Sequence, residues 1–159
     1  MIEAAKSGRL AHLAIIPAVI GLDLATKAWA RSELRFGQPV EVLPFFDLTL
    51  GYNRGVAFGL LNGAGGLAVL LVTAAISLMF GVWFWREPRQ LTRLGLTLVL
   101  GGALGNFFDR LSRGEVTDFL DLHVLGSHWP AFNLADAAIT LGAIVLVIDM
   151  LRARKETRL

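Results

Sequence analysis

The chain contains no cysteine and few charged residues. Without cysteine it can form no disulfide, no thiolate metal site and no cysteine nucleophile. Only 18% of its 159 residues are charged and 55% are hydrophobic, whereas soluble domains carry about 25% charged residues. The mean hydropathy is +0.60. This composition indicates an integral membrane protein with a single domain spanning residues 1–159.

Several common catalytic and binding motifs are also missing. The sequence has no HExxH, no G-x-S-x-G, no P-loop and no dinucleotide fingerprint. Its histidines, His12, His123 and His128, lack the spacing of a metal site on a helix. The net charge of +2 is small, and the basic residues gather at the ends of apolar segments. This pattern suits membrane topology rather than nucleic-acid binding.

Four stretches are long enough to cross a bilayer, which needs about 20 mostly apolar residues in a helix. They cover about residues 10–30, 67–85, 94–110 and 134–151. An even number of spans puts both termini on one side. Nine basic residues lie on that side and six on the other, so the positive-inside rule makes the side with the termini cytoplasmic.

Two connections then lie on the outer side, at about residues 36–66 and 111–133. In the first of them, VEVL and DLTLGY alternate apolar and polar residues between glycine and proline. Such alternation predicts a few short strands. The sequence therefore predicts a membrane all-α bundle of four helices with short strands between the first two.

Ionisable side chains within spans are costly, so each is a candidate functional residue. Asp23 and Lys27 are four residues apart on the first span and can pair. They form either a structural ion pair or part of a substrate site. Asn106 and Arg110 share a face of the third span in the same way. Asp109 lies one residue off that face, where it can pair with Arg110 or cap the loop.

Two further patterns each allow a structural interpretation. Gly101 and Gly105 form a small-xxx-small pattern, which lets another helix approach closely. Asn53 and Gly55 form an Asn-x-Gly pattern that is common in turns. Alternatively, the Asn53 amide projects into a site and holds a backbone carbonyl.

Two acids lie near the outer ends of the third and fourth spans. If these spans pack together, Asp118 and Asp136 can converge and hold one proton between them. Such a pair can hydrolyse a peptide, because one carboxylate activates water while the other polarises the carbonyl. The alternative is that Asp136 caps the fourth helix, where the helix dipole favours an anion. Asp109 and Asp121 compete as partners in a pair.

Four motifs, in this order, resemble those of the bacterial lipoprotein signal peptidases, or signal peptidase II: DLATK, YNRGVAF, GGALGNFFDRLSRGEVTDF and PAFNLADAAI. The resemblance implies a membrane aspartic endopeptidase. Such an enzyme removes signal peptides from prolipoproteins by cleaving before a diacylglyceryl-modified cysteine, with two aspartates and an activated water. By motif position the catalytic pair would be Asp118 and Asp136, whereas Asp109 and Asp121 lie outside the family's catalytic positions.

The resemblance also implies an extracytoplasmic β-rich cradle between helices 1 and 2, and a site near the outer face of the bacterial cytoplasmic (inner) membrane. Residues expected to support the pair or bind substrate are Asp23, Lys27, Asn53, Gly55, Asn106, Arg110 and Asn133. The expected partners are lipid-modified prolipoproteins, membrane lipids and globomycin-type inhibitors. We expect a monomer with no metal or other cofactor, because paired carboxylates supply both acid and base.

Two other functions suit a four-span chain with acids in or near its spans. A proton pathway would need polar groups throughout the membrane depth, but residues 67–85 contain no charge. A scaffold that binds a partner helix through GGALG would leave Asp118 and Asp136 replaceable. An assay of prolipoprotein cleavage after substitution of each acid therefore separates the peptidase from these alternatives.

Overall fold

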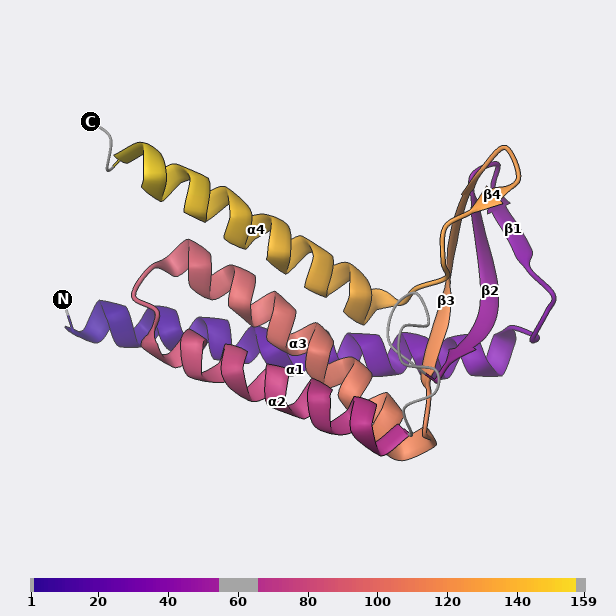
Figure 1. The fold of residues 1–159 in the computed structure, drawn as a ribbon, viewed down its shortest axis with the longest axis horizontal. Helices are drawn as coiled ribbons and strands as arrows, with labels where there is room; N and C mark the ends of the chain where they lie inside the picture. Colours follow the sequence, from indigo (N-terminus) through magenta and orange to yellow (C-terminus); the bar gives the residue numbers. More distant parts are fainter. Residues whose placement is uncertain (1, 55–65, 157–159) are drawn as a thin grey trace.

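The computed structural model describes residues 2–54 and 66–156 of the chain. Over these residues it contains α1 (Ile2–Glu33), β1 (Val40–Leu43), β2 (Phe46–Asn53), α2 (Gly66–Arg86), α3 (Gln90–Arg113), β3 (Val116–Val124), β4 (Ser127–His128) and α4 (Leu134–Glu156). The start of α1, the end of α4 and the α2–α3 connection lie at one end of the bundle (Figure 1). The sheet lies at the other end.

All four helices of the described chain are long and apolar enough to cross a membrane. This agrees with the predicted four-helix bundle. The central helix is α3, which packs against α1, α2 and α4 and is mostly buried. Its mean hydropathy is only 1.3, against 2.4 for α2. Because protein rather than lipid surrounds most of α3, this helix can carry polar side chains that α2 cannot.

Glycines on two faces of α3 allow its close packing. A Cβ atom at Gly101 would lie 2.8 Å from the Cβ of Val19, and one at Gly105 would lie 2.6 Å from Oδ2 of Asp23. The predicted close approach of another helix is thus confirmed, and that helix is α1. On a second face, a Cβ at Gly102 would overlap the carbonyl oxygen of Ala135 in α4.

We expect Gly102→Ala to destabilise the protein by about 1–3 kcal/mol, the usual cost of overpacking. The clash is with backbone, so α3 and α4 must separate beside the first turn of α4. The matched control is Gly81→Ala on α2, where an added Cβ meets nothing within 4 Å. That substitution should be neutral or stabilising by up to about 1 kcal/mol through helix propensity. Equilibrium unfolding in detergent compares them, and equal stabilities would contradict the packing role of Gly102.

The sheet is antiparallel, with strand order β1-β2-β3-β4. β1 and β2 are the strands predicted from VEVL and DLTLGY. β3 and β4 come from the second connection and were not predicted, so the cradle is built by both connections rather than by the first alone. The β2–β3 register places Gly51 opposite Asp118 and Asn53 opposite Val116.

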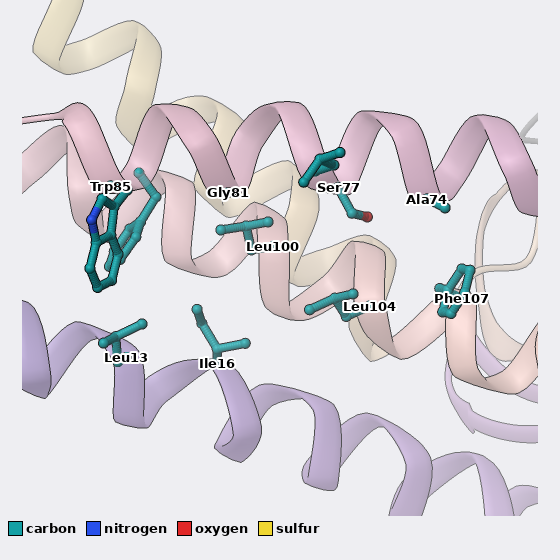
Figure 2. Close-up of a pocket in the computed structure, with 11 residues that line it drawn as sticks. Leu13, Ile16, Ala74, Ser77, Gly81, Trp85, Leu100, Leu104 and Phe107 are labelled. Atoms are coloured by element: carbon teal, nitrogen blue, oxygen red, sulfur yellow. The ribbon is translucent and has the colours of Figure 1, made fainter.

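An apolar cavity of about 430 Å³ lies between α1, α2 and α3. Figure 2 shows Leu13 and Ile16 of α1 facing Leu100 of α3, with Trp85 of α2 nearby. The lining is largely apolar, and the Ser77 hydroxyl donates to the backbone oxygen of Thr73 at 2.8 Å. This cavity offers no acid or base, so the candidate site lies elsewhere, at the sheet end of the bundle.

Candidate active site

Asn133 connects the two acids that the sequence analysis singled out. Its Nδ2 donates to Oδ1 of Asp118 at 2.7 Å, and its Oδ1 accepts from the backbone N–H of Asp136 at 3.0 Å. Oδ2 of Asp136 accepts in return from the backbone N–H of Asn133 at 3.2 Å. These reciprocal bonds form a capping box. Asp136 is therefore not the helix cap: Asn133 caps α4, and Asp136 is the third residue of the helix.

A chain of hydrogen bonds holds the other oxygen of Asp136. Oδ1 accepts from Nδ2 of Asn106 at 2.8 Å, and Oδ1 of Asn106 accepts from Nζ of Lys27 at 2.7 Å. Lys27 also donates to Oδ2 of Asp23 at 2.7 Å, which confirms the predicted pair. Oδ1 of Asp23 accepts from the N–H of Ala135 at 2.9 Å. The network thus runs from α4 through α3 and α1 back to α4, and it fixes the Asp136 carboxylate.

Strand pairing brings Asp118 to the same place. The backbone N–H groups of Phe119 and Leu120 both donate to the carbonyl of Phe132, at 3.0 and 2.8 Å. This pairing ties β3 to the residue just before Asn133. Asn53 on β2 lies on the same face as Asp118 and hydrogen-bonds its carboxylate. The Asn53 side chain thus reaches one of the two candidate acids; the Asn-x-Gly turn falls partly outside the described residues, because Gly55 is not among them.

Asp118 is almost fully buried, and this raises the cost of its charged form. Burial is the main cause and the nearby Asp136 carboxylate the second; together they raise the pKa of Asp118 to about 7. Hydrogen bonds from Asn133 and Asn53 act in the opposite direction. With this pKa, Asp118 can carry a proton at neutral pH.

Arg110 is a buried cation beside these acids. It lies on the α3 face that also carries Asn106 and interacts electrostatically with Asp118, Asp136 and Asp109. A positive charge there offsets the repulsion between the two acids of the pair. The structure therefore brings together six of the seven predicted supporting residues. Gly55, the seventh, lies outside the described residues.

A second network beside the pair was not predicted from the sequence. Asp109 is buried; its Oδ2 accepts from the backbone N–H of Thr117 at 2.8 Å, and its Oδ1 pairs with Arg31 at 3.3 Å. Arg31 also donates to the Thr117 hydroxyl at 2.9 Å. These bonds fix the start of β3, and hence Asp118, on α1 and α3. Asp109 also interacts electrostatically with Arg110, the partner suggested from the sequence; its contacts with Arg31 and Thr117 were not predicted.

We expect Asp109→Ala to destabilise the protein by about 1–3 kcal/mol, because the buried N–H of Thr117 loses its acceptor. Asp109→Asn keeps an acceptor oxygen and should retain more of that stability. Equilibrium unfolding of both variants in detergent measures the difference. If Asp109→Ala were as stable as the native chain, the start of β3 would not depend on this bond.

The remaining sequence candidates lie apart from this cluster. Asp121 pairs with the exposed His128 at 2.9 Å toward the other end of β3. Among the described residues, no three His, Asp or Glu side chains are arranged to hold a metal ion.

Comparison with known proteins identifies relatives along most of the chain. The model of the family described as signal peptidase (SPase) II matches residues 15–152. A lipoprotein signal peptidase of Burkholderia thailandensis is 48% identical over 144 residues, which cover 88% of this chain and 87% of that protein. One of Shewanella amazonensis is 42% identical over 144 residues, covering 87% and 86%.

Two solved structures, each described as a bacterial membrane enzyme, have the same fold. The first has a TM-score of 0.83 and 31% identity, covering 92% of this chain and 90% of that one. The second has a TM-score of 0.78 and 32% identity, covering 89% and 92%. The four-helix bundle with its small sheet is therefore shared with experimentally determined membrane enzymes.

Proposed function

This chain belongs to the signal peptidase II family, and from that membership we propose that it is a membrane aspartic endopeptidase of prolipoproteins. It removes the signal peptide by cleaving before the diacylglyceryl-modified cysteine. Asp118 and Asp136 are the proposed catalytic pair. The observation that carries this assignment is the single amide of Asn133, which bonds Asp118 through its nitrogen and the start of the Asp136 helix through its oxygen.

The proposed mechanism uses one proton shared by the pair. Asp136, as the base, takes a proton from water while that water attacks the carbonyl carbon of the scissile bond. Asp118 donates its proton to the carbonyl oxygen, which gives a neutral tetrahedral diol. Collapse of the diol returns a proton to Asp118, and Asp136 passes its own to the leaving amine. Each proton transfer of this kind contributes about 10²–10⁴ to the rate.

Supporting residues have distinct proposed roles. Asn106 and Asn133 hold Asp136 and Asp118 in place, and Asn53 is close enough to Asp118 to bind the substrate backbone beside it. Lys27 and Asp23 act through Asn106 and the start of α4 rather than on the substrate. Arg110 offsets the single negative charge that the pair carries throughout the reaction. The two carboxylates supply acid and base, so the mechanism employs no metal or other cofactor.

We place the protein in the bacterial cytoplasmic membrane, with both termini in the cytoplasm and the pair at the outer face. The support is the charge bias: among the described residues, the bundle end opposite the sheet carries eight basic residues, against six at the sheet end. The network described above is complete within one copy of the chain, so the proposed site needs no second copy, and we propose a single-domain monomer. Membrane lipids surround the spans, and we expect globomycin-type inhibitors to compete with substrate at the pair.

The proposal is tested with the purified chain in detergent micelles and a lipidated prolipoprotein. We expect one cleavage, with the lipid-modified cysteine as the new N-terminal residue in mass spectrometry. The control substrate is the same prolipoprotein without the diacylglyceryl group, which should remain uncut. Equal cleavage of both substrates, or of neither, would contradict the proposed specificity.

A further inference from the structure

The turn between β3 and β4 has an unusual residue for its geometry. Leu125 and Gly126 form its two-residue loop and have φ values of 50° and 79°. Two positive φ angles define the type I′ turn, which favours asparagine followed by glycine. A leucine at the first position is sterically strained. The chain therefore places leucine here against the local backbone preference.

The leucine side chain is also fully exposed. Its exposed fraction is 100%, and those of its neighbours Val124 and Trp129 are 69% and 61%. Phe45 and Leu122, also exposed, line a cavity of about 500 Å³ beside the turn together with Val124 and Trp129. We call residues 122–129 the hairpin tip. It presents a contiguous apolar surface, of the kind that marks contact with a partner or a membrane.

The charges at the hairpin tip are placed so that contact with lipid has a low free-energy cost. Residues 122–129 contain no Lys, Arg, Asp or Glu. The two histidines stack on each other with ring centroids 4.8 Å apart, and each faces an acid: His123 lies 3.4 Å from Asp47, and His128 lies 2.9 Å from Asp121. Each histidine of the tip thus lies beside an acid of the sheet, although the His128 side chain is half exposed, and no unpaired ion of the tip would have to leave water.

The location of the tip indicates which apolar phase it meets. The sheet lies across the end of the helix bundle. Its β4 end, which contains the hairpin tip, extends sideways past the start of α4 (Figure 1). All four spanning helices have one terminus at the sheet end of the bundle. The membrane surface at this end therefore continues sideways from the bundle, beside the hairpin tip. Tryptophan is enriched at such interfaces. Lipid is therefore the apolar partner that is always present next to the tip.

We propose that the hairpin tip inserts Leu125 and Trp129 into the lipid interface at the sheet end of the bundle, and thereby anchors the free edge of the sheet to the membrane. The anchor holds the sheet, which carries Asp118 at its other end, at a fixed height above the bilayer. This anchoring proposal requires that the chain lies in a membrane but does not require peptidase activity. The anchoring proposal and the proposed peptidase function can therefore fail separately.

The absence of cysteine permits a clean test by spin labelling. A nitroxide is attached to Leu125→Cys, and the protein is placed in liposomes of phosphatidylcholine and phosphatidylglycerol. The collision rates of the nitroxide with oxygen and with a water-soluble nickel chelate report how deeply the label lies in the bilayer. Leu78→Cys, on the exposed face of α2, gives the lipid reference, and Glu33→Cys, at the exposed end of α1, gives the water reference. We expect the ratio of the oxygen collision rate to the nickel collision rate to be several-fold higher at the Leu125 label than at the Glu33 label. A ratio equal to that of the Glu33 label overturns the proposal.

A second variant separates the anchor from the fold. Leu125→Asn suits the type I′ turn, so its unfolding temperature in detergent should be unchanged or higher. A nitroxide at Val124→Cys should nevertheless shift toward the water reference when Leu125→Asn is added. If the Val124 label keeps the same lipid contact in the double variant, Leu125 is not the anchor.

Discussion

Asp118→Asn and Asp136→Asn are each expected to reduce the initial rate of prolipoprotein cleavage by about 10³-fold or more, because each removes one partner of a proton transfer. Asparagine keeps the size of the side chain and one acceptor oxygen. Asp118→Asn can therefore keep the bond from Asn133, and Asp136→Asn can keep the bond from either Asn106 or the backbone of Asn133. The rate is measured with lipidated substrate in micelles. Thermal unfolding of the same preparations shows that the variants remain folded.

The matched control is Asp121→Asn, an identical change on β3. Asp121 pairs with His128, away from the cluster, so near-native activity is expected. Near-native cleavage by Asp118→Asn or Asp136→Asn would contradict the assigned pair. It would favour a proton pathway or a scaffold, since neither requires peptide hydrolysis by these acids.

Lys27→Met is expected to destabilise the protein by about 3–5 kcal/mol, the usual cost of removing one partner from a buried ion pair. Lys27 and Asp23 both have an exposed fraction of 0%, so the Asp23 carboxylate would remain buried without its cation. Asn106 would also lose the donor that orients its amide toward Asp136. Equilibrium unfolding in mixed detergent micelles measures the loss.

Two further variants give this prediction its controls. Lys27→Met with Asp23→Asn removes both charges and keeps an acceptor for the N–H of Ala135, so it should recover much of the stability. Arg54→Met breaks the exposed pair with Glu115 and should cost less than about 1 kcal/mol. If Lys27→Met cost no more than Arg54→Met, the buried pair would not stabilise the bundle.

Much of the fold could be predicted from the sequence because a membrane limits the length and composition of the segments that cross it. Length and apolarity located the spans, and alternation located β1 and β2. β3 was missed because Val116–Phe119 is buried on both faces, which hides the alternation from sequence. Asp23 and Lys27 were found because charges within a span are rare.

Contacts between distant segments could not be derived from sequence in the same way. Arg31 and Asp109 are 78 residues apart, and only the packing of α1 on α3 brings them together. The capping role of Asn133, by contrast, could have been predicted from the sequence. Asn-x-x-Asp before an apolar run is typical of a capping box, and it would have placed the cap at Asn133 rather than Asp136. The positions of the spans made Asp118 and Asp136 one candidate pair, and the family resemblance selected them over Asp109 and Asp121.

An infrared titration tests the shared-proton pair most directly. The protonated carboxyl band of Asp118, isolated as the difference between the native chain and Asp118→Asn, should disappear with a midpoint at a pKa of about 7. The group is neutral below that pH and charged above it, so cleavage should decline as the pH rises through the midpoint. Asp136→Asn should lower the midpoint, because the Asp136 charge is the second cause that raises this pKa. A native midpoint near that of an ordinary aspartate, about 3.9, or one unaffected by Asp136→Asn, would contradict the pair.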